Sequence, residues 1–134
     1  MNQNKPAQQL AANVVIADDH PIFCQGIQFA LSGLPFIDQC HQANDGLAAY
    51  QYIQVEKPAL ALLDIDMPKM TGLEVAQAIF DDELDTKVIL ITSHLDEKFF
   101  HQAIVLGVQG FLFKMDTEDE FEECIKKVLA GERH

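Results

Sequence analysis

The sequence predicts a single α/β domain in which β-strands and α-helices alternate five times along 134 residues. Two observations support this prediction. Four short apolar runs are continuous rather than alternating, which is typical of strands buried on both faces of a sheet. The segments between them place apolar residues at helical spacing. Parallel strands joined through helices need crossover connections, so we expect a mostly parallel sheet with helices on both faces.

The predicted strands are rich in Val, Ile, Leu or Phe, and each is too short for a helix. The four clear ones span residues 14–17, 60–63, 88–91 and 110–113. A weaker candidate at residues 36–41 lies between the first two and completes the set of five.

The predicted helices show one apolar stripe each, and residues that start or stop helices flank them. Asn44 and Asp116 are the expected N-caps, while Gly33, Gly107 and Gly131 follow periodic stretches where a helix would end. The two clearest stripes are Phe23, Ile27, Ala30, Leu31 and Leu34, and Phe121, Cys124, Ile125, Val128 and Leu129.

The composition excludes several classes of function. A formal net charge of −12 with only 9 Lys and Arg argues against direct binding of nucleic acid or of an anionic membrane surface. The longest apolar run, residues 59–63, is far shorter than the ~20 residues of a membrane helix. The three cysteines lack the spacing of a zinc site or a disulfide framework, which favours a reducing cytoplasm.

The first dozen residues differ from the rest. Residues 1–12 are rich in Gln, Asn and Ala and lack the apolar core of a signal peptide. We therefore expect a flexible N-terminal segment at residues 1–12, followed by one folded domain at residues 13–132.

Polar residues follow four of the predicted strands at the point where each ends. Asp18 and Asp19 follow the first strand, Asp64 the third, Thr92 the fourth and Lys114 the fifth. In an open parallel sheet, ligands bind outside the carboxyl ends of the strands. Buried charges are costly unless they are paired or bind a metal, so this group predicts a functional site.

The residue types in this group fit phosphoryl chemistry. Clustered carboxylates repel one another, and Mg²⁺, a hard ion held by one or two carboxylates plus a phosphate, removes that cost. Lys114 supplies a mobile positive charge for a phosphoryl oxygen, and the Thr92 hydroxyl can donate to another. Asp64 can then accept a phosphoryl group as a mixed anhydride.

The segments IADDHPIF, LLDIDMPKMTGLE, VILITS and GVQGFLFK occur in an order and spacing that resemble one known family. The chain resembles the CheY-like receiver domains of two-component response regulators, and among them the NarL or LuxR-type group. The resemblance covers residues 14–132. It implies a flavodoxin-like (βα)5 domain with a parallel sheet of strand order 2-1-3-4-5.

The resemblance also implies roles for individual residues. It predicts that Asp64 is the phosphorylated residue and that Asp19 binds magnesium directly, whereas Asp18 binds it through water. The backbone carbonyl of Asp66 would complete the protein's share of the coordination. A conformational switch would follow phosphorylation, in which Thr92 turns toward the phosphoryl group.

In this switch the ring of Phe111 rotates inward behind Thr92, which changes the surface near the last strand and helices. The implied partners are a sensor histidine kinase and a second copy of the chain in a phosphorylation-linked homodimer. The resemblance further implies a C-terminal helix-turn-helix output domain that binds DNA and is missing from this sequence. A free-standing receiver that relays phosphate is the alternative. The chain itself is not expected to be an enzyme.

Some residues fall outside the family pattern or the predicted site. Thr71 stands where Asp is frequent, and Met115 where many receivers carry Pro. The sequence favours a structural or surface role for the histidines, with His94 the one to modulate dephosphorylation; those considered are His20, His41, His94 and His101.

Two other functions compete with the receiver. LLDIDMP also resembles the strand and DxD motif of haloacid dehalogenase phosphatases, which use an Asp nucleophile. Against that alternative, Pro68 replaces the expected Thr or Val, the acidic pair precedes the nucleophile, and the chain is short. The second competitor is a receiver-like interaction module that no longer accepts phosphate, although every residue needed for transfer is present.

Overall fold

The computed structural model describes residues 11–93 and 96–132. Within this part of the chain, all strand pairs are parallel and the sheet order is β2-β1-β3-β4-β5, which confirms the predicted fold. The strands are β1 (Ala12–Ala17), β2 (Ile37–Ala43), β3 (Leu60–Asp64), β4 (Lys87–Thr92) and β5 (Gly110–Phe113). The helices are α2 (Pro21–Ser32), α3 (Gly46–Glu56), α4 (Gly72–Asp81), α5 (Glu97–Leu106) and α6 (Glu118–Leu129).

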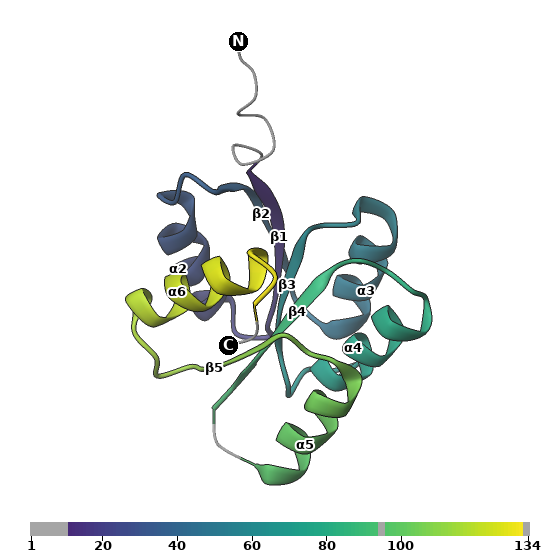
Figure 1. The fold of residues 1–134 in the computed structure, drawn as a ribbon. Helices are drawn as coiled ribbons and strands as arrows, with labels where there is room; N and C mark the ends of the chain where they lie inside the picture. Colours follow the sequence, from purple (N-terminus) through teal and green to yellow (C-terminus); the bar gives the residue numbers. More distant parts are fainter. Residues whose placement is uncertain (1–10, 94–95, 133–134) are drawn as a thin grey trace.

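The sheet lies between two helical layers. Helices α2 and α6 cover one face, and α3, α4 and α5 cover the other (Figure 1). Alternate residues of the central strand β3 therefore enter two separate cores: Leu60 and Leu62 pack toward α2 and α6, and Ala61 and Leu63 toward α3 and α4. Burial on both faces explains why the central strands are continuous apolar runs.

The second strand departs most from its predicted bounds. It spans Ile37–Ala43 rather than residues 36–41, because it pairs with β1 as far as Ala17 and Ala43. As an edge strand with several exposed polar residues, it lacks the apolar signal of the central strands. The first strand begins at Ala12, and the flexible segment expected at residues 1–12 falls mainly outside the described residues.

Both predicted N-caps were wrong by one residue. Asp45, not Asn44, caps α3, and its carboxylate accepts a hydrogen bond of 2.8 Å from the first turn. Thr117, not Asp116, caps α6, because Glu120 stands three residues later and completes a reciprocal capping box. Cap identity is decided by which side chain reaches the free N–H groups, and two adjacent candidates look alike in sequence.

The connection from β3 to α4 is fixed by close backbone packing. Thr71 caps α4 in a capping box, so this departure from the family's frequent Asp keeps a capping side chain. A Cβ at Gly72 would lie 2.5 Å from the backbone oxygen of Asp64, and one at Gly46 would lie 1.9 Å from that of Met70. Only glycine fits at both positions, and this packing holds the loop beside Asp64 in place.

No helix in residues 11–93 or 96–132 is long and apolar enough to cross a membrane.

Candidate functional site

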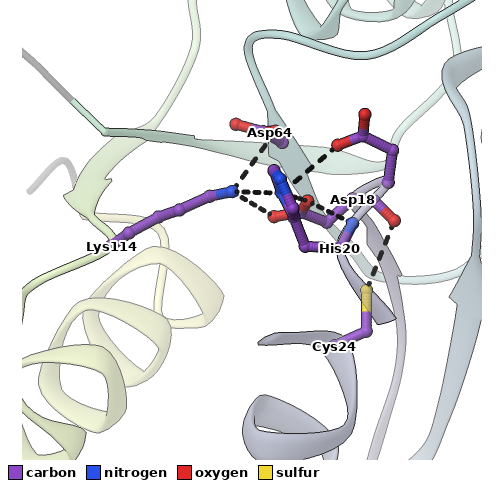
Figure 2. Close-up of polar contacts among 6 residues, drawn as sticks. Asp18, His20, Cys24, Asp64 and Lys114 are labelled. Carbon is purple, nitrogen blue, oxygen red and sulfur yellow. Dashed lines mark hydrogen bonds and ion pairs between the residues drawn. The ribbon is translucent and has the colours of Figure 1, made fainter. Parts of the chain in front are cut away.

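The predicted polar residues meet at one edge of the sheet. Asp64 is the last residue of β3, Thr92 the last residue of β4, and Lys114 follows β5 directly. Asp18 and Asp19 follow β1, whose Ala17 pairs with Leu63 of β3. Because neighbouring strands end at nearly the same level, side chains from distant parts of the sequence converge (Figure 2).

Two carboxylates are buried in this site. Asp18 is 1% exposed and Asp64 3% exposed, whereas the Asp19 side chain is 40% exposed. The backbone N–H of Asp18 donates to Ala43, and its backbone oxygen accepts a weak hydrogen bond of 3.6 Å from the Cys24 thiol. Asp18 is therefore anchored between β2 and α2, while Asp19 faces the solvent side.

Lys114 provides the positive charge in the site. Its Nζ lies 2.9 Å from Asp18 Oδ2 and 3.5 Å from Asp64 Oδ2, so the ammonium is closer to Asp18. It also lies 5.0 Å from the centre of the Phe23 ring. Burial acts to lower the pKa of Lys114, but the two carboxylates outweigh this effect and raise it. Lys114 stays charged, and Figure 2 shows it reaching across the edge of the sheet.

The electrostatics of Asp64 are unfavourable without a further cation. Burial raises the pKa of Asp64 to about 6, and the charge of Asp18 adds to the rise. The positive charge of Lys114 and a backbone hydrogen bond from Asp66 oppose the rise without cancelling it. The ionised form of Asp64 is thus held in an environment that penalises it.

The donor groups fit a divalent cation. Asp18, Asp19, His20 and Asp64 each offer one ligand atom, and these atoms all lie within 4.8 Å of one another. Asp18 Oδ2 is buried, and the Lys114 ammonium lies 2.9 Å from it. One ammonium faces several carboxylates here, and their hard oxygens suit Mg²⁺.

The two predicted switch residues lie on neighbouring strands. Thr92 and Phe111 are both half-buried, and they line a cavity of about 70 Å³. The Phe111 ring packs against that of Phe100 on α5, with centroids 4.6 Å apart and planes inclined by 38°. The cavity leaves space beside the Thr92 and Phe111 side chains into which one of them could turn.

His20, for which the sequence favoured a structural or surface role, is exposed and lies against the residues of the site. Its Nδ1 lies 2.9 Å from Asp18 Oδ1, 3.3 Å from Asp19 Oδ1 and 3.1 Å from Lys114 Nζ. The available signal was its position between the acidic pair and Pro21, which begins α2 and makes His20 the N-cap residue. The backbone of His20 is extended at this N-cap position, and its imidazole lies among the site residues.

The other histidines do not join the site in the part of the chain that the structure describes. His41 stacks on Tyr52, with ring centroids 4.0 Å apart, in agreement with a structural role. His101 lies exposed on α5. His94 lies outside the described residues, so its expected effect on dephosphorylation stays a prediction.

Comparison with known proteins shows the family of the chain. The model of the response regulator receiver domain matches residues 14–126, which is most of the chain. The chain therefore belongs to the response regulator receiver domain family. This assignment favours the receiver over the phosphatase alternative.

The relatives are NarL-type and other LuxR-family regulators. A NarL transcriptional regulatory protein of Mycobacterium tuberculosis is 40% identical over 118 residues, which are 88% of this chain and 55% of that protein. The DegU transcriptional regulatory protein of Brevibacillus brevis is 29% identical over 128 residues, or 96% of this chain and 54% of that protein. The chain thus spans about half the length of these relatives.

Solved structures show the same fold. The signal receiver domain of NarL from Mycobacterium tuberculosis superimposes with a TM-score of 0.87 at 38% identity, covering 91% of this chain and 98% of that one. A DNA-binding response regulator of the LuxR family from Staphylococcus aureus gives a TM-score of 0.84 at 30% identity, covering 88% and 98%.

Proposed function

We propose that Asp64 is a phosphoacceptor, which takes a phosphoryl group from a sensor histidine kinase or a small phosphodonor with the help of Mg²⁺. The observation that carries this proposal is the position of Asp64: its carboxylate is buried at the end of β3, beside Asp18 and within 3.5 Å of Lys114. Membership of the receiver family supports the same assignment.

The transfer is a nucleophilic displacement at phosphorus. An oxygen of the Asp64 carboxylate attacks the phosphorus of phosphohistidine or acetyl phosphate, and a new P–O bond forms. The bond to the imidazole nitrogen or acetate oxygen breaks, and that group leaves with the electron pair. With the pKa of Asp64 at about 6, most of its carboxylate is ionised at pH 7 and can act as the nucleophile.

Neighbouring residues would stabilise the acyl phosphate. Lys114 pairs with one phosphoryl oxygen, and the Thr92 hydroxyl donates to another. Bound Mg²⁺ would neutralise charge on the phosphoryl oxygens. The residues that would hold it are Asp19 and Asp64 directly, Asp18 through water, and the backbone carbonyl of Asp66.

Phosphorylation would control a surface formed by α5, β5 and the start of α6. Thr92 moves toward the phosphoryl group, and Phe111 turns inward. This surface carries apolar side chains that are unusually exposed, which supports a role in homodimerisation or contact with an output domain. They are Phe100, Ile104, Val105, Phe113 and Met115.

The whole protein is proposed to be a cytoplasmic transcription regulator with a DNA-binding helix-turn-helix domain after the receiver. The support is that the chain matches only about half the length of regulators such as NarL. Sequencing the native gene tests this proposal. A reading frame that continues into a helix-turn-helix would support it, whereas a stop codon directly after His134 would favour a free-standing phosphorelay receiver.

Mass spectrometry after incubation with acetyl phosphate and MgCl2 tests the central proposal. We expect one phosphate on Asp64, loss of labelling in Asp64→Asn, and retention in the control Asp38→Asn, which changes an exposed carboxylate on β2. Labelling should also be lost when a chelator removes magnesium. A covalent phosphate on another residue of the wild type would contradict the assignment.

Each chain is proposed to accept one phosphoryl group on Asp64. It is not proposed to be an enzyme that turns over a separate substrate. Incubation with a stable phosphomonoester such as p-nitrophenyl phosphate should release no more product than a buffer control. Sustained release that depends on Asp64 would favour the phosphatase alternative. Absence of any labelling of Asp64 would favour an interaction module that has lost phosphate acceptance.

A further inference from the structure

A pocket opens between α2 and α6, the two helices that cover the same face of the sheet (Figure 1). Its volume is about 420 Å³, which falls within the ~300–1,000 Å³ of pockets that hold small organic ligands. Both helices and the turn after α2 contribute apolar side chains to its lining, which include Ile22, Phe23, Ile27, Leu31, Leu34 and Phe121.

The α2 side of the pocket is apolar and open. At Gly26 the pocket extends to the helix backbone, and a Cβ there would meet no described heavy atom within 4 Å. Ile22, one turn earlier, also lines the pocket and is 85% exposed. Helix α2 carries no charged residue from Pro21 to Ser32. An apolar molecule can therefore contact this wall without removing a charge from water.

The α6 side of the pocket is negatively charged. Its acidic lining residues are Asp116, Glu118, Asp119 and Glu122. Glu118 and Asp119 have a structural reason to be there, because acids in the first turn favour the positive end of the helix dipole. Glu122 lies beyond that turn and is half-buried. It makes no ion pair with any residue that the structure describes, including Lys126 one turn later.

The basic residue of the lining, Lys114, does not cancel this charge. Its ammonium is already paired at the strand ends, where it lies 2.9 Å from Asp18 and 3.5 Å from Asp64. The pocket thus has a positive group at the end near the sheet and carboxylates along α6. A cationic group is favoured beside the carboxylates, whereas an anion would face all of them.

We propose that this pocket binds a small amphipathic amine, with its apolar body between α2 and α6 and its ammonium beside Glu122. A confined apolar lining with a few charged groups is the common form of a small-molecule site. Burial of the apolar body contributes affinity, and the carboxylates select the charge. This ligand is neither the phosphodonor nor the metal of the proposed function, so the inference does not depend on labelling of Asp64.

Titration of the full chain with three matched probes tests the inference. Naphthalen-1-ylmethylamine is a cation at neutral pH, naphthalen-1-ylmethanol is neutral, and naphthalen-1-ylacetate is an anion. Binding is followed through the backbone amide resonances of isotope-labelled protein. Salt at about 0.15 M screens non-specific attraction to a chain of net charge −12.

The amine should bind saturably and shift amide resonances of α2 and α6. It should bind roughly 2–5-fold more tightly than the alcohol, as expected for a charge pair at a partly exposed rim, and the carboxylate should bind least. Equal affinities for the three probes would overturn the inference, and so would absence of saturable binding of the amine. Resonance shifts at the pocket that follow only protein concentration would assign it to a second copy of the chain and overturn the inference as well.

Gly26→Leu is the variant that fills the pocket. Its side chain should occupy the open space at α2 and abolish saturable binding of the amine. Gln25→Leu adds the same side chain at an exposed position outside the lining and should bind like the wild type. Circular dichroism melting checks that both variants fold, which helix propensity favours for leucine. Binding that persists in folded Gly26→Leu would overturn the location.

A second pair of variants tests the charge selection. Glu122→Gln should reduce the preference for the amine over the alcohol, because it removes the carboxylate beside the ammonium. Glu123→Gln is the control, since Glu123 lies outside this pocket and pairs with Lys127 at 3.2 Å. It should keep the preference of the wild type. An unchanged preference in Glu122→Gln would overturn the proposed position of the ammonium.

Discussion

At the scale of single residues, Asp64 combines the position proposed for the phosphoacceptor with an energetic cost. Its carboxylate is buried next to a second buried carboxylate, and its pKa is raised from 3.8 to about 6. Because the folded state then holds a proton more tightly than the unfolded state, folding stability declines as pH rises through this window. The cost is greatest where Asp64 is ionised, and the ionised form is the one proposed to accept a phosphoryl group.

We predict that Asp64→Asn stabilises the metal-free protein at neutral pH. The free energy of unfolding should rise by about 1–3 kcal/mol at pH 7.5, since the amide removes a desolvated charge beside Asp18. The gain should be absent below pH 4 and complete above pH 6–7, where Asp64 of the wild type is ionised. Urea unfolding at several pH values, with chelator present, measures it.

The exposed-site variant Asp38→Asn is the control and should change stability by less than about 0.5 kcal/mol. The wild type could instead become more stable than Asp64→Asn as pH rises from 4 to 7. That result would show that the charge of Lys114 outweighs burial in setting the pKa of Asp64. In that case, the assigned direction of the Asp64 pKa would be wrong.

At the scale of elements, glycines decide how closely the loops around the site approach one another. Gly46 begins α3 directly against the backbone of Met70 in the loop after β3. Gly26 lies inside α2, and a Cβ there would have no described heavy atom within 4 Å. The two glycines therefore have opposite roles, one required by packing and one that only weakens a helix.

We predict that alanine at these two positions shifts stability in opposite directions. Gly46→Ala should lower the free energy of unfolding by at least about 1–3 kcal/mol, because the added methyl group overlaps a backbone oxygen that cannot move alone. Gly26→Ala should raise it by about 0.5–1 kcal/mol through helix propensity. Thermal and urea unfolding measure both; shifts of the same sign would contradict the packing around Gly46.

At the scale of the whole molecule, the three thiols report on the integrity of the fold. Burial raises the pKa of Cys24 to about 11 and the pKa values of Cys40 and Cys124 to about 12. Cys24 and Cys124 are buried, whereas Cys40 on the edge strand β2 is half-buried. Reaction of a thiol with a reagent needs the thiolate and access, so the folded state should protect all three.

We predict that iodoacetamide at pH 8 labels Cys40 first and labels Cys24 and Cys124 only as the whole domain unfolds. Labelling of the two buried thiols should slow further when MgCl2 is added, because an ion that binds the folded state alone lowers the unfolded population. Pulse labelling followed by mass spectrometry measures the order. Labelling of Cys124 as fast as Cys40 under native conditions would contradict the described core.

Local pattern determined the fold class and most of the site. The central strands are buried on both faces, so each is a continuous apolar run, and the polar residues at their ends were predicted to meet at one edge of the sheet, where the structure places them. The order of the strands came from the family resemblance, and the structure confirmed it. The predicted bounds of the edge strand β2 and the predicted cap of α3 were less accurate, because exposed strands and adjacent polar residues carry weaker signals.

Tertiary structure decided which groups touch within the site. His20 and Lys114 are 94 residues apart in sequence, and their contact depends on the register of four strands, β1, β3, β4 and β5, and on the start of α2. The same packing brings Lys114 closer to Asp18 than to Asp64 and presses Gly46 against Met70. Sequence predicts which strand end a side chain occupies, but distances of a few ångströms are set by how the crossovers place those ends together.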